Sequence, residues 1–488
     1  RLEEPLYAMF VSAASCISGP DVDDNHDLAS RIHLGMNQLS TDNSALLLLM
    51  PSETCSLSIS TLGDPYQLPN MERKDSMLFH YYVAEMCPQC IVRNGYNKSY
   101  RQVILPLVNK SNILLRAILA FTANRVKLQD NRFRTIALRH QGAVLHGLQQ
   151  SLNNKNRTSF SRLEILSTIL MLCFFEIYNP GQTPKDPHGL PIRPWMTHAR
   201  GVRMLLDLGP LDSHDSHYEK AVVSFLSQYF ASRSVLAFTS LSPLEDQIEI
   251  FDHAQYWLGM IDRPPEEINP FAGCSNELLK SILVITSRMR QVAQSRSQSL
   301  PGLQQTWANM MANHLFAMDQ LPPAERRDGD ASAKLPSQHA CSTPATLLEK
   351  TSEAFRLATV VLLGNLYPQL DITAHEQTEL CLDRLGEILG SGVAVPQHGA
   401  LGASSYIWPY FVAGCHLQSP DQKVSLAQRI RQLFSRNLSA DTASGQILCV
   451  LEEVWSLPVG HRAAACSDGD SFLWESTKLN RHRVLEWV

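Results

Sequence analysis

The chain has 488 residues, of which 44% are hydrophobic and 18% are charged, and its formal net charge is −5. Proteins that hold nucleic acid by neutralising its phosphates are normally basic, with Lys and Arg clustered on one surface. The densest basic group here consists of Arg481, His482 and Arg483. We therefore expect no direct DNA binding by this chain, while its length allows a large hydrophobic core.

Membrane and secreted proteins are also disfavoured by the sequence. The longest apolar runs cover residues 169–175 and 45–50, and both are far shorter than the about 20 residues that cross a bilayer. No basic start followed by an apolar run marks a secretory signal. The eleven cysteines are odd in number and spread along the chain, which is typical of reduced intracellular thiols. We therefore expect no membrane association.

The first part of the chain lacks a regular pattern. Residues 13–70 are rich in Ser, Asp, Asn and Pro and contain one apolar patch, Ala45–Met50. Such a composition buries too little apolar surface to offset the entropy of ordering. We predict that residues 1–70 are mostly a flexible linker, in which the patch can serve as a docking segment, and that residues 71–488 form one domain.

From about residue 75 onward, apolar residues recur at helical spacing. It predicts helices, in chain order, over residues 75–86, 112–128, 132–152, 161–178, 197–208, 219–238, 275–292, 355–367, 377–389, 423–434 and 446–455. Asp75 or Ser76 is the predicted cap of the first helix.

Three of these segments predict which face is buried. The segment 161–178 is apolar around almost its whole circumference, so it belongs in the middle of a core. In 275–292 the buried stripe is predicted to be Leu278, Ile282, Ile285, Met289 and Val292. In 132–152 it is predicted to be Ile136, Leu138, Ala143, Leu145 and Leu148.

The remaining pattern completes the fold prediction. Residues 322–345 carry little apolar content and are predicted to be a disordered insertion. No strand alternation and no hairpin dipeptide between β-branched runs is visible. The sequence therefore predicts an all-α protein, a single large multi-helix array with flexible linkers.

No pattern of residues predicts a metal site or a catalytic site. Cys87 and Cys90 have the C-x-x-C spacing of a zinc half-site, but a tetrahedral site needs four ligands and no second pair follows. We interpret them as two thiols at a helix end. His214 and His217, with Asp215 between them, are more simply a solvated helix start than a metal site. No nucleophile, acid–base or phosphate-binding motif is present, so we expect no enzyme activity, no catalytic residue and no cofactor.

Several stretches, in this order, resemble a known family. They are FHYYVAEMCP, YRQVILPLVNKSNILLRAILAFTANR, ALRHQGAVLHGL, LSTILMLCFFEIY, WMTHARGVRMLLDLG, INPFAGCSNELLKSI, SSYIWPYFVAGCHLQ and VLEEVWSL, spread over residues 76–458. The succession is similar to the fungal-specific regulatory domain of zinc-cluster (Zn₂Cys₆) transcription factors, in particular the subgroup with arginine-metabolism, acriflavine-sensitivity and sterol-uptake regulators. It implies an all-helical regulatory domain, a nuclear location and control of RNA polymerase II genes.

The resemblance also implies partners. Relatives usually carry a six-cysteine cluster that binds two zincs, followed by a dimerising coil. That run is absent from these residues, so zinc and DNA contact are expected only through an upstream domain. Coactivators or other regulators, and a second copy in a homodimer, are the expected protein partners.

A second hypothesis concerns a small hydrophobic ligand, such as a sterol, which some relatives sense in a helical pocket. The candidate lining residues are Phe174, Phe175, Tyr406, Trp408 and Phe411. Ordinary core packing is the alternative, and we favour it because large apolar residues lie mostly inside proteins.

Overall fold

A computed structural model gives the fold of the chain. It describes residues 71–87, 104–126, 131–153, 162–177, 194–207, 216–239, 247–269, 272–295, 301–322, 347–367, 370, 374–390, 400–417, 419–433 and 443–457. The predicted linker 1–70 and nearly all of the predicted insertion 322–345 lie outside these residues.

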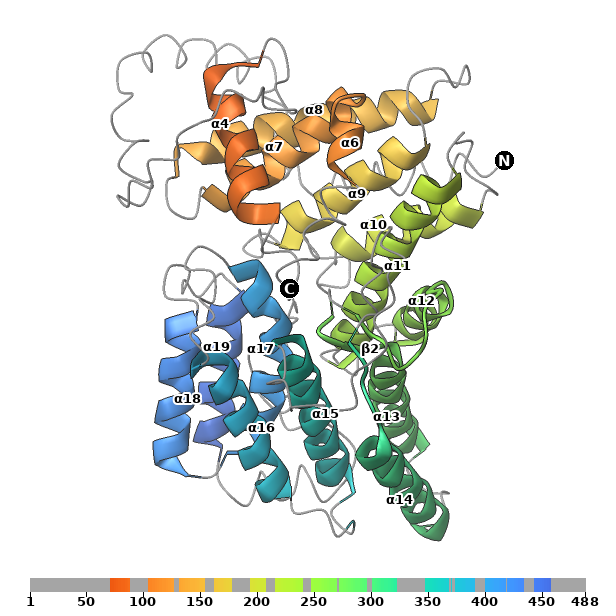
Figure 1. The fold of residues 1–488 in the computed structure, drawn as a ribbon, viewed down its shortest axis with the longest axis vertical. Helices are drawn as coiled ribbons and strands as arrows, with labels where there is room; N and C mark the ends of the chain where they lie inside the picture. Colours follow the sequence, from red (N-terminus) through yellow and green to blue (C-terminus); the bar gives the residue numbers. More distant parts are fainter. Residues whose placement is uncertain are drawn as a thin grey trace, which may run out of the picture.

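The described part of the chain is built almost entirely of helices, which confirms the all-α prediction. Figure 1 shows three groups of helices, coloured in chain order. One continuous cluster of buried hydrophobic side chains runs through all three groups.

The first group forms the upper part of Figure 1. It contains α4 (Arg73–Tyr81), its π-helical continuation η2 (Tyr82–Met86), α6 (Leu105–Val108), α7 (Asn112–Val126), α8 (Phe133–Asn153) and α9 (Arg162–Ile177). Helix α9 packs against α7, α8, α10 and α11. Its residues 165–175 are all buried, which confirms that its apolar circumference places it inside the core.

The second group lies on the right of Figure 1. It contains α10 (Pro194–Asp207), α11 (Ser216–Thr239), α12 (Gln247–Gly259), β1 (Ile268–Asn269), β2 (Cys274–Ser275), α13 (Asn276–Ser295) and α14 (Pro301–Ala317). On α13 the described members of the predicted stripe, Leu278, Ile282, Ile285 and Met289, are buried, so the 4,3,4 spacing identified the correct face.

The third group contains α15 (Leu347–Leu366), α16 (Ala374–Gly390), α17 (Ala400–Cys415), α18 (Pro420–Leu433) and α19 (Ala443–Ser456). Helix α15 packs against α13, α14, α16, α17 and both strands. It therefore joins the second group to the third.

The structure corrects the expectation that no strands are present. Strands β1 and β2 pair antiparallel, Ile268 with Ser275 and Asn269 with Cys274. Gly273 closes the turn between them at φ 79°, a backbone conformation that side chains other than Gly rarely adopt. Strands of two residues are too short to show an alternating pattern, so the sequence carried no signal for them.

The buried face predicted for α8 was correct in part: Leu148 is buried, and Ile136 and Leu145 are partly buried against the core. Leu138 is 45% exposed, whereas Phe133, Ala137, Val144 and Leu148 are buried. Two polar residues, His140 and Gln141, are buried on the same face. Because each of them bonds to another helix, the helix turns a partly polar stripe inward and leaves a leucine outside.

Two other predictions needed revision. Helix α4 begins at Arg73, before the predicted caps. Glu72 occupies its N-cap position but makes no capping hydrogen bond with its side chain. Asp75 instead bonds to His140 of α8. Helices α6, α12 and α14 add to those predicted. The buried stripe of α14 is built on Ala308, Ala312 and Leu315, and alanines give only a weak hydrophobic signal.

Candidate functional site

The residues proposed to line a ligand pocket lie on two helices. Phe174 and Phe175 are on α9, and Trp408 and Phe411 are on α17. All four side chains are buried. Tyr406 also falls on α17, but its side chain lies outside the described part of the structure.

Phe174 belongs to a row of aromatic rings. Its ring stacks on Phe121 of α7 with the centroids 5.4 Å apart, and it meets Tyr229 of α11 edge-on at 5.0 Å. The row continues from Tyr229 to Phe230 at 5.2 Å and from Phe230 to Trp257 of α12 at 5.0 Å. Offset and edge-on aromatic pairs add about 0.5–1.5 kcal/mol each beyond the burial of their area. The row therefore holds α7, α9, α11 and α12 together.

Trp408 belongs to a different cluster. Its indole Nε1–H donates to Thr239 Oγ1 of α11 at 3.1 Å, and Thr239 in turn donates to the carbonyl of Leu236 at 2.6 Å. The indole stacks on Phe355 of α15 with the centroids 5.5 Å apart. Trp408 thus joins α17 to α11 and α15, and its polar atom is satisfied within the core.

The two clusters contact α11 at separate places. Tyr229 meets Phe174, and Thr239 meets Trp408. Ten residues of α-helix separate these two contacts, which is about 15 Å along the axis. The structure therefore brings the candidate residues to the same hydrophobic core but assigns Phe174 and Trp408 to different sets of neighbours.

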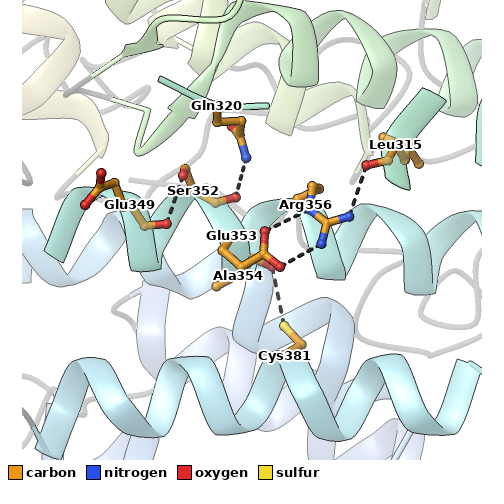
Figure 2. A network of polar contacts seen from close by, with 8 residues as sticks. All are labelled: Leu315, Gln320, Glu349, Ser352, Glu353, Ala354, Arg356 and Cys381. Atoms are coloured by element: carbon orange, nitrogen blue, oxygen red, sulfur yellow. Dashed lines mark hydrogen bonds and ion pairs between the residues drawn. The ribbon is translucent and has the colours of Figure 1, made fainter. Parts of the chain in front are cut away.

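A polar junction lies at the middle of the molecule, between the end of α14, strand β2 and helix α15 (Figure 2). The backbone N–H of Ser275 donates to Gln320 Oε1 at 2.8 Å, and Gln320 Nε2 donates to the carbonyl of Ser352 at 2.7 Å. One side chain therefore satisfies a buried strand N–H and reaches a helix. Nothing in the sequence around Gln320 singled it out, because its partners are 45 and 32 residues away.

The junction continues along α15 (Figure 2). Arg356 donates to the carboxylate of Glu353 at 2.8 and 2.6 Å and to the carbonyl of Leu315 at 3.0 Å. Leu315 lies in the last turn of α14, where carbonyls have no partner within the helix. Cys381 of α16 donates its thiol hydrogen to the carbonyl of Ala354 at 3.4 Å. The Arg356 side chain therefore connects α15 to α14, and the Cys381 thiol connects α16 to the backbone of α15.

Charged groups tie α10 to α12. Arg200 forms an ion pair with Glu249, and the guanidinium of Arg203 lies 4.3 Å from the ring centroid of Tyr256. The Tyr256 hydroxyl donates to Asp207 Oδ1 at 3.1 Å. Burial raises the pKa of Tyr256 to about 12, and the hydrogen bond and negative charge of Asp207 add to the effect. The hydroxyl therefore remains a donor at neutral pH.

Several buried side chains hold polar atoms that have no hydrogen-bond partner in the described part of the chain. Among them are His198 of α10, at both ring nitrogens, and Trp257 of α12, at Nε1. Burial lowers the pKa of His198 to about 4, so the ring is neutral at pH 7. A buried polar group without a partner costs about 1–3 kcal/mol.

The cysteines of the described residues are free thiols, and Cys87, Cys173, Cys274, Cys381 and Cys415 are buried. Burial raises the pKa of Cys173, Cys274 and Cys381, so these thiols stay protonated and are poor nucleophiles and metal ligands. Cys87 ends η2, and Cys90 lies outside the described residues.

Within the described ranges, no three His, Cys, Asp or Glu residues come together as a metal site would require. His214 and Asp215 lie outside those ranges, and only the backbone of His217, at the start of α11, is described. No described helix is both long enough and apolar enough to span a bilayer.

The fold is thus an all-α multi-helix domain whose polar side chains connect helices to one another. Residues 77–462 match a family described as the fungal specific transcription factor domain. Because the match covers more than half of the chain, the chain belongs to this family, and the family-level resemblance drawn from its motifs is confirmed. Neither curated proteins nor solved structures gave a match.

Proposed function

We propose that this chain is the regulatory domain of a fungal regulator of RNA polymerase II genes that acts in the nucleus. The observation that carries the proposal is the family match over residues 77–462. The motif order favours the subgroup that includes arginine-metabolism, acriflavine-sensitivity and sterol-uptake regulators. DNA would be contacted by a zinc cluster that is not among these residues, which agrees with a net charge of −5.

In this role the domain acts through protein contacts rather than catalysis. It controls when a tethered DNA reader and coactivators or other regulators come together. The junction around α15 supports such a role because Gln320 and Arg356 add hydrogen bonds to the hydrophobic packing that joins the second and third groups of helices. A change at one group is then felt at the other.

The test is a reporter assay with the full chain fused to a heterologous DNA-binding domain in a fungal host. We expect reporter output to differ several-fold from that of the DNA-binding domain alone. Arg356→Ala, which breaks the contact between α15 and α14, should change this output. Arg384→Ala is the matched control, because Arg384 pairs with Glu387 on the surface of a single helix.

The outcome is interpreted at equal protein abundance, measured by immunoblot, together with nuclear fractionation. A chain that is abundant, nuclear and without effect on both activated and repressed reporters would contradict the proposal. An equal response to Arg356→Ala and Arg384→Ala would contradict the part assigned to the junction.

The second candidate function is sensing of a small hydrophobic ligand. The observation that favours it is the N–H of Trp257, which is buried without a partner inside the aromatic row that runs from Tyr82 through Phe121 and Phe174 to Tyr256. A sterol or fatty acid would add apolar contacts and one acceptor for this donor.

This candidate is tested by adding a sterol and a long-chain fatty acid, separately, to the purified full chain. We expect one of them to raise the melting temperature of the wild-type chain and to have a smaller effect on Trp257→Phe. Trp455→Phe, on the half-buried face of α19, is the control and should respond like the wild type. No shift with either compound, and no lipid in an organic extract of the chain, would contradict ligand sensing.

A further inference from the structure

Charge is distributed very unevenly along this chain. Residues 86–163 contain thirteen Lys and Arg and a single acidic residue, Asp130, whereas the rest of the chain contains 29 Lys and Arg and 46 Asp and Glu. The first segment therefore has a net charge of +12 and the remainder a net charge of −17. The net charge of −5 for the whole chain hides this separation, so it does not exclude an anionic partner for one part of the surface.

The structure places this basic segment in the first group of helices. Its described parts, residues 104–126 and 131–153, hold six Lys and Arg and no Asp or Glu. Four of the six are exposed: Lys110, Arg132, Arg134 and Arg139. Arg132 directly precedes α8, and Arg134 and Arg139 lie in its first two turns. Within the described residues, the positive charge of the segment therefore reaches the surface mainly along one helix.

The outward face of α8 is polar and lacks acidic side chains. Besides its arginines, the exposed residues of α8 are Thr135, Leu138, Gly142, His146, Gln149 and Gln150. Most of them can donate a hydrogen bond. Nothing lies within 4 Å of a Cβ built at Gly142, so a bound group can approach the backbone there. Arg132 and Arg139 are seven residues apart, which is about 10 Å along the helix axis.

The acidic residue that contacts Arg139 does not reverse the sign of this face. Asp75 of α4 accepts a hydrogen bond from His140 at 3.1 Å and lies 3.8 Å from the guanidinium of Arg139. The side chain of Asp75 is 16% exposed, against 42% for that of Arg139. Arg116 of α7 adds a further positive charge that acts on the same carboxylate. Asp75 therefore positions Arg139, while the surface stays positive.

We propose that the outward face of α8, defined by Arg132, Arg134, Arg139 and the polar residues between them, contacts the phosphate backbone of duplex DNA. The contact is to phosphate and sugar, so it carries no base-sequence information. This inference rests on the proposed function for DNA as the partner, because a domain tethered to a DNA reader meets the flanking backbone at high effective concentration. The duplex repels the rest of the surface, which is negative overall, so α8 is the face that approaches it.

Other anionic partners fit this face less well. Leu138, which is 45% exposed, is the single exposed large hydrophobic residue among the described side chains of α8. An acidic peptide that docks through apolar side chains needs a larger apolar surface. Helices that lie on anionic membranes insert Trp, Phe and Leu, and single-stranded nucleic acid stacks its bases on aromatic rings. A duplex backbone requires only positive charge and hydrogen-bond donors, which this face supplies.

The experiment is a titration of a fluorescent duplex of about 20 base pairs with the full chain, followed by anisotropy at several salt concentrations. We expect a dissociation constant of about 1–100 µM, the range of sequence-independent DNA binding. Three phosphate contacts predict a slope of about −3 for the logarithm of the association constant against that of the salt concentration. Two duplexes of unrelated sequence should bind alike.

The variant Arg132→Gln combined with Arg134→Gln removes two of the three charges and leaves the contact between Arg139 and Asp75. We expect its affinity to fall about tenfold or more and its salt slope to drop to about −1. Arg384→Gln combined with Arg431→Gln is the matched control, because these side chains are 46% and 51% exposed on the third group of helices. The control should bind like the wild type. Circular dichroism and melting verify the fold of both variants.

A wild-type chain that binds no duplex at about 200 µM in low salt overturns the proposal, as does a control that weakens binding as much as the α8 variant. Preferential binding of duplex RNA, of phosphatidylserine vesicles, or of a synthetic acidic peptide such as residues 467–475 of this chain, SDGDSFLWE, would show a different occupant and would also overturn it. A chain that changes reporter output but binds no duplex would contradict this inference alone and leave the proposed function standing.

Discussion

Replacing Trp408 with Phe tests whether this residue belongs to the core or to a ligand site. In the structure its indole N–H donates to Thr239, and its ring stacks on Phe355. The substitution removes the donor and part of the ring from a fully buried position. A ligand-facing ring would have no such partners within the protein, and its loss would leave the fold nearly unchanged.

The expected cost follows from these contacts. The lost hydrogen bond contributes about 0.5–1.5 kcal/mol. The smaller ring leaves a cavity of the kind that costs about 1–2 kcal/mol or more in large-to-small core substitutions. We therefore expect the free energy of unfolding to fall by about 1.5–3.5 kcal/mol, read as a lower melting temperature and a lower urea midpoint.

A double-mutant cycle isolates the hydrogen bond. Thr239→Val removes the acceptor but leaves the indole N–H buried, so it should also destabilise. The double variant should be less destabilised than the sum of the two, by about 1 kcal/mol. Trp455→Phe is the comparison: it also loses an indole hydrogen bond, to the carbonyl of Gly414 at 2.8 Å, but Trp455 is only half-buried, so this substitution should destabilise less than Trp408→Phe. An unchanged melting temperature for Trp408→Phe, or strictly additive effects, would refute the assignment of Trp408 to the core.

Three further predictions concern other parts of the fold. Gly414→Val should destabilise by about 1–3 kcal/mol, because a Cβ there would lie 2.7 Å from Leu426 Cδ2; Gly142→Ala, which has open space around it, should be neutral or stabilising in the same urea titration. Burial alone would raise the pKa of Asp75, but the hydrogen bond and charge of His140 hold this pKa below its ordinary value of 3.8. The contribution of Asp75 to stability is therefore complete above pH 3.8 and is lost as the pH falls through the lower pKa of the folded state. Asp75→Asn should accordingly flatten the acid side of a profile of melting temperature against pH, and a profile identical to that of the wild type would contradict the pairing. Chelator treatment should leave helical circular dichroism and melting unchanged, and a loss of helix that zinc restores would contradict the interpretation of Cys87.

The local sequence pattern was sufficient to predict the buried face of a helix wherever hydrophobic residues alone mark that face. The apolar circumference of α9 predicted a central helix, and the 4,3,4 spacing on α13 predicted its buried face. The order of the motifs along the chain predicted the family that the match over 77–462 confirmed. These conclusions depend on residues close together in sequence, whose spacing on a helix is set by its 3.6-residue period.

Only the tertiary structure decided which neighbours each face meets. It buries His140 and Gln141 on α8 and leaves Leu138 outside, because Asp75 and Glu176 on other helices supply their partners. Trp408 finds Thr239 at a separation of 169 residues, and Gln320 joins two segments that no pattern connects to it. The same holds for the arginines on the outward face of α8, whose number is visible in the sequence but whose exposure is not. Sequence spacing specifies the faces of a helix, whereas long-range packing decides whether a face meets the core, a polar partner or solvent.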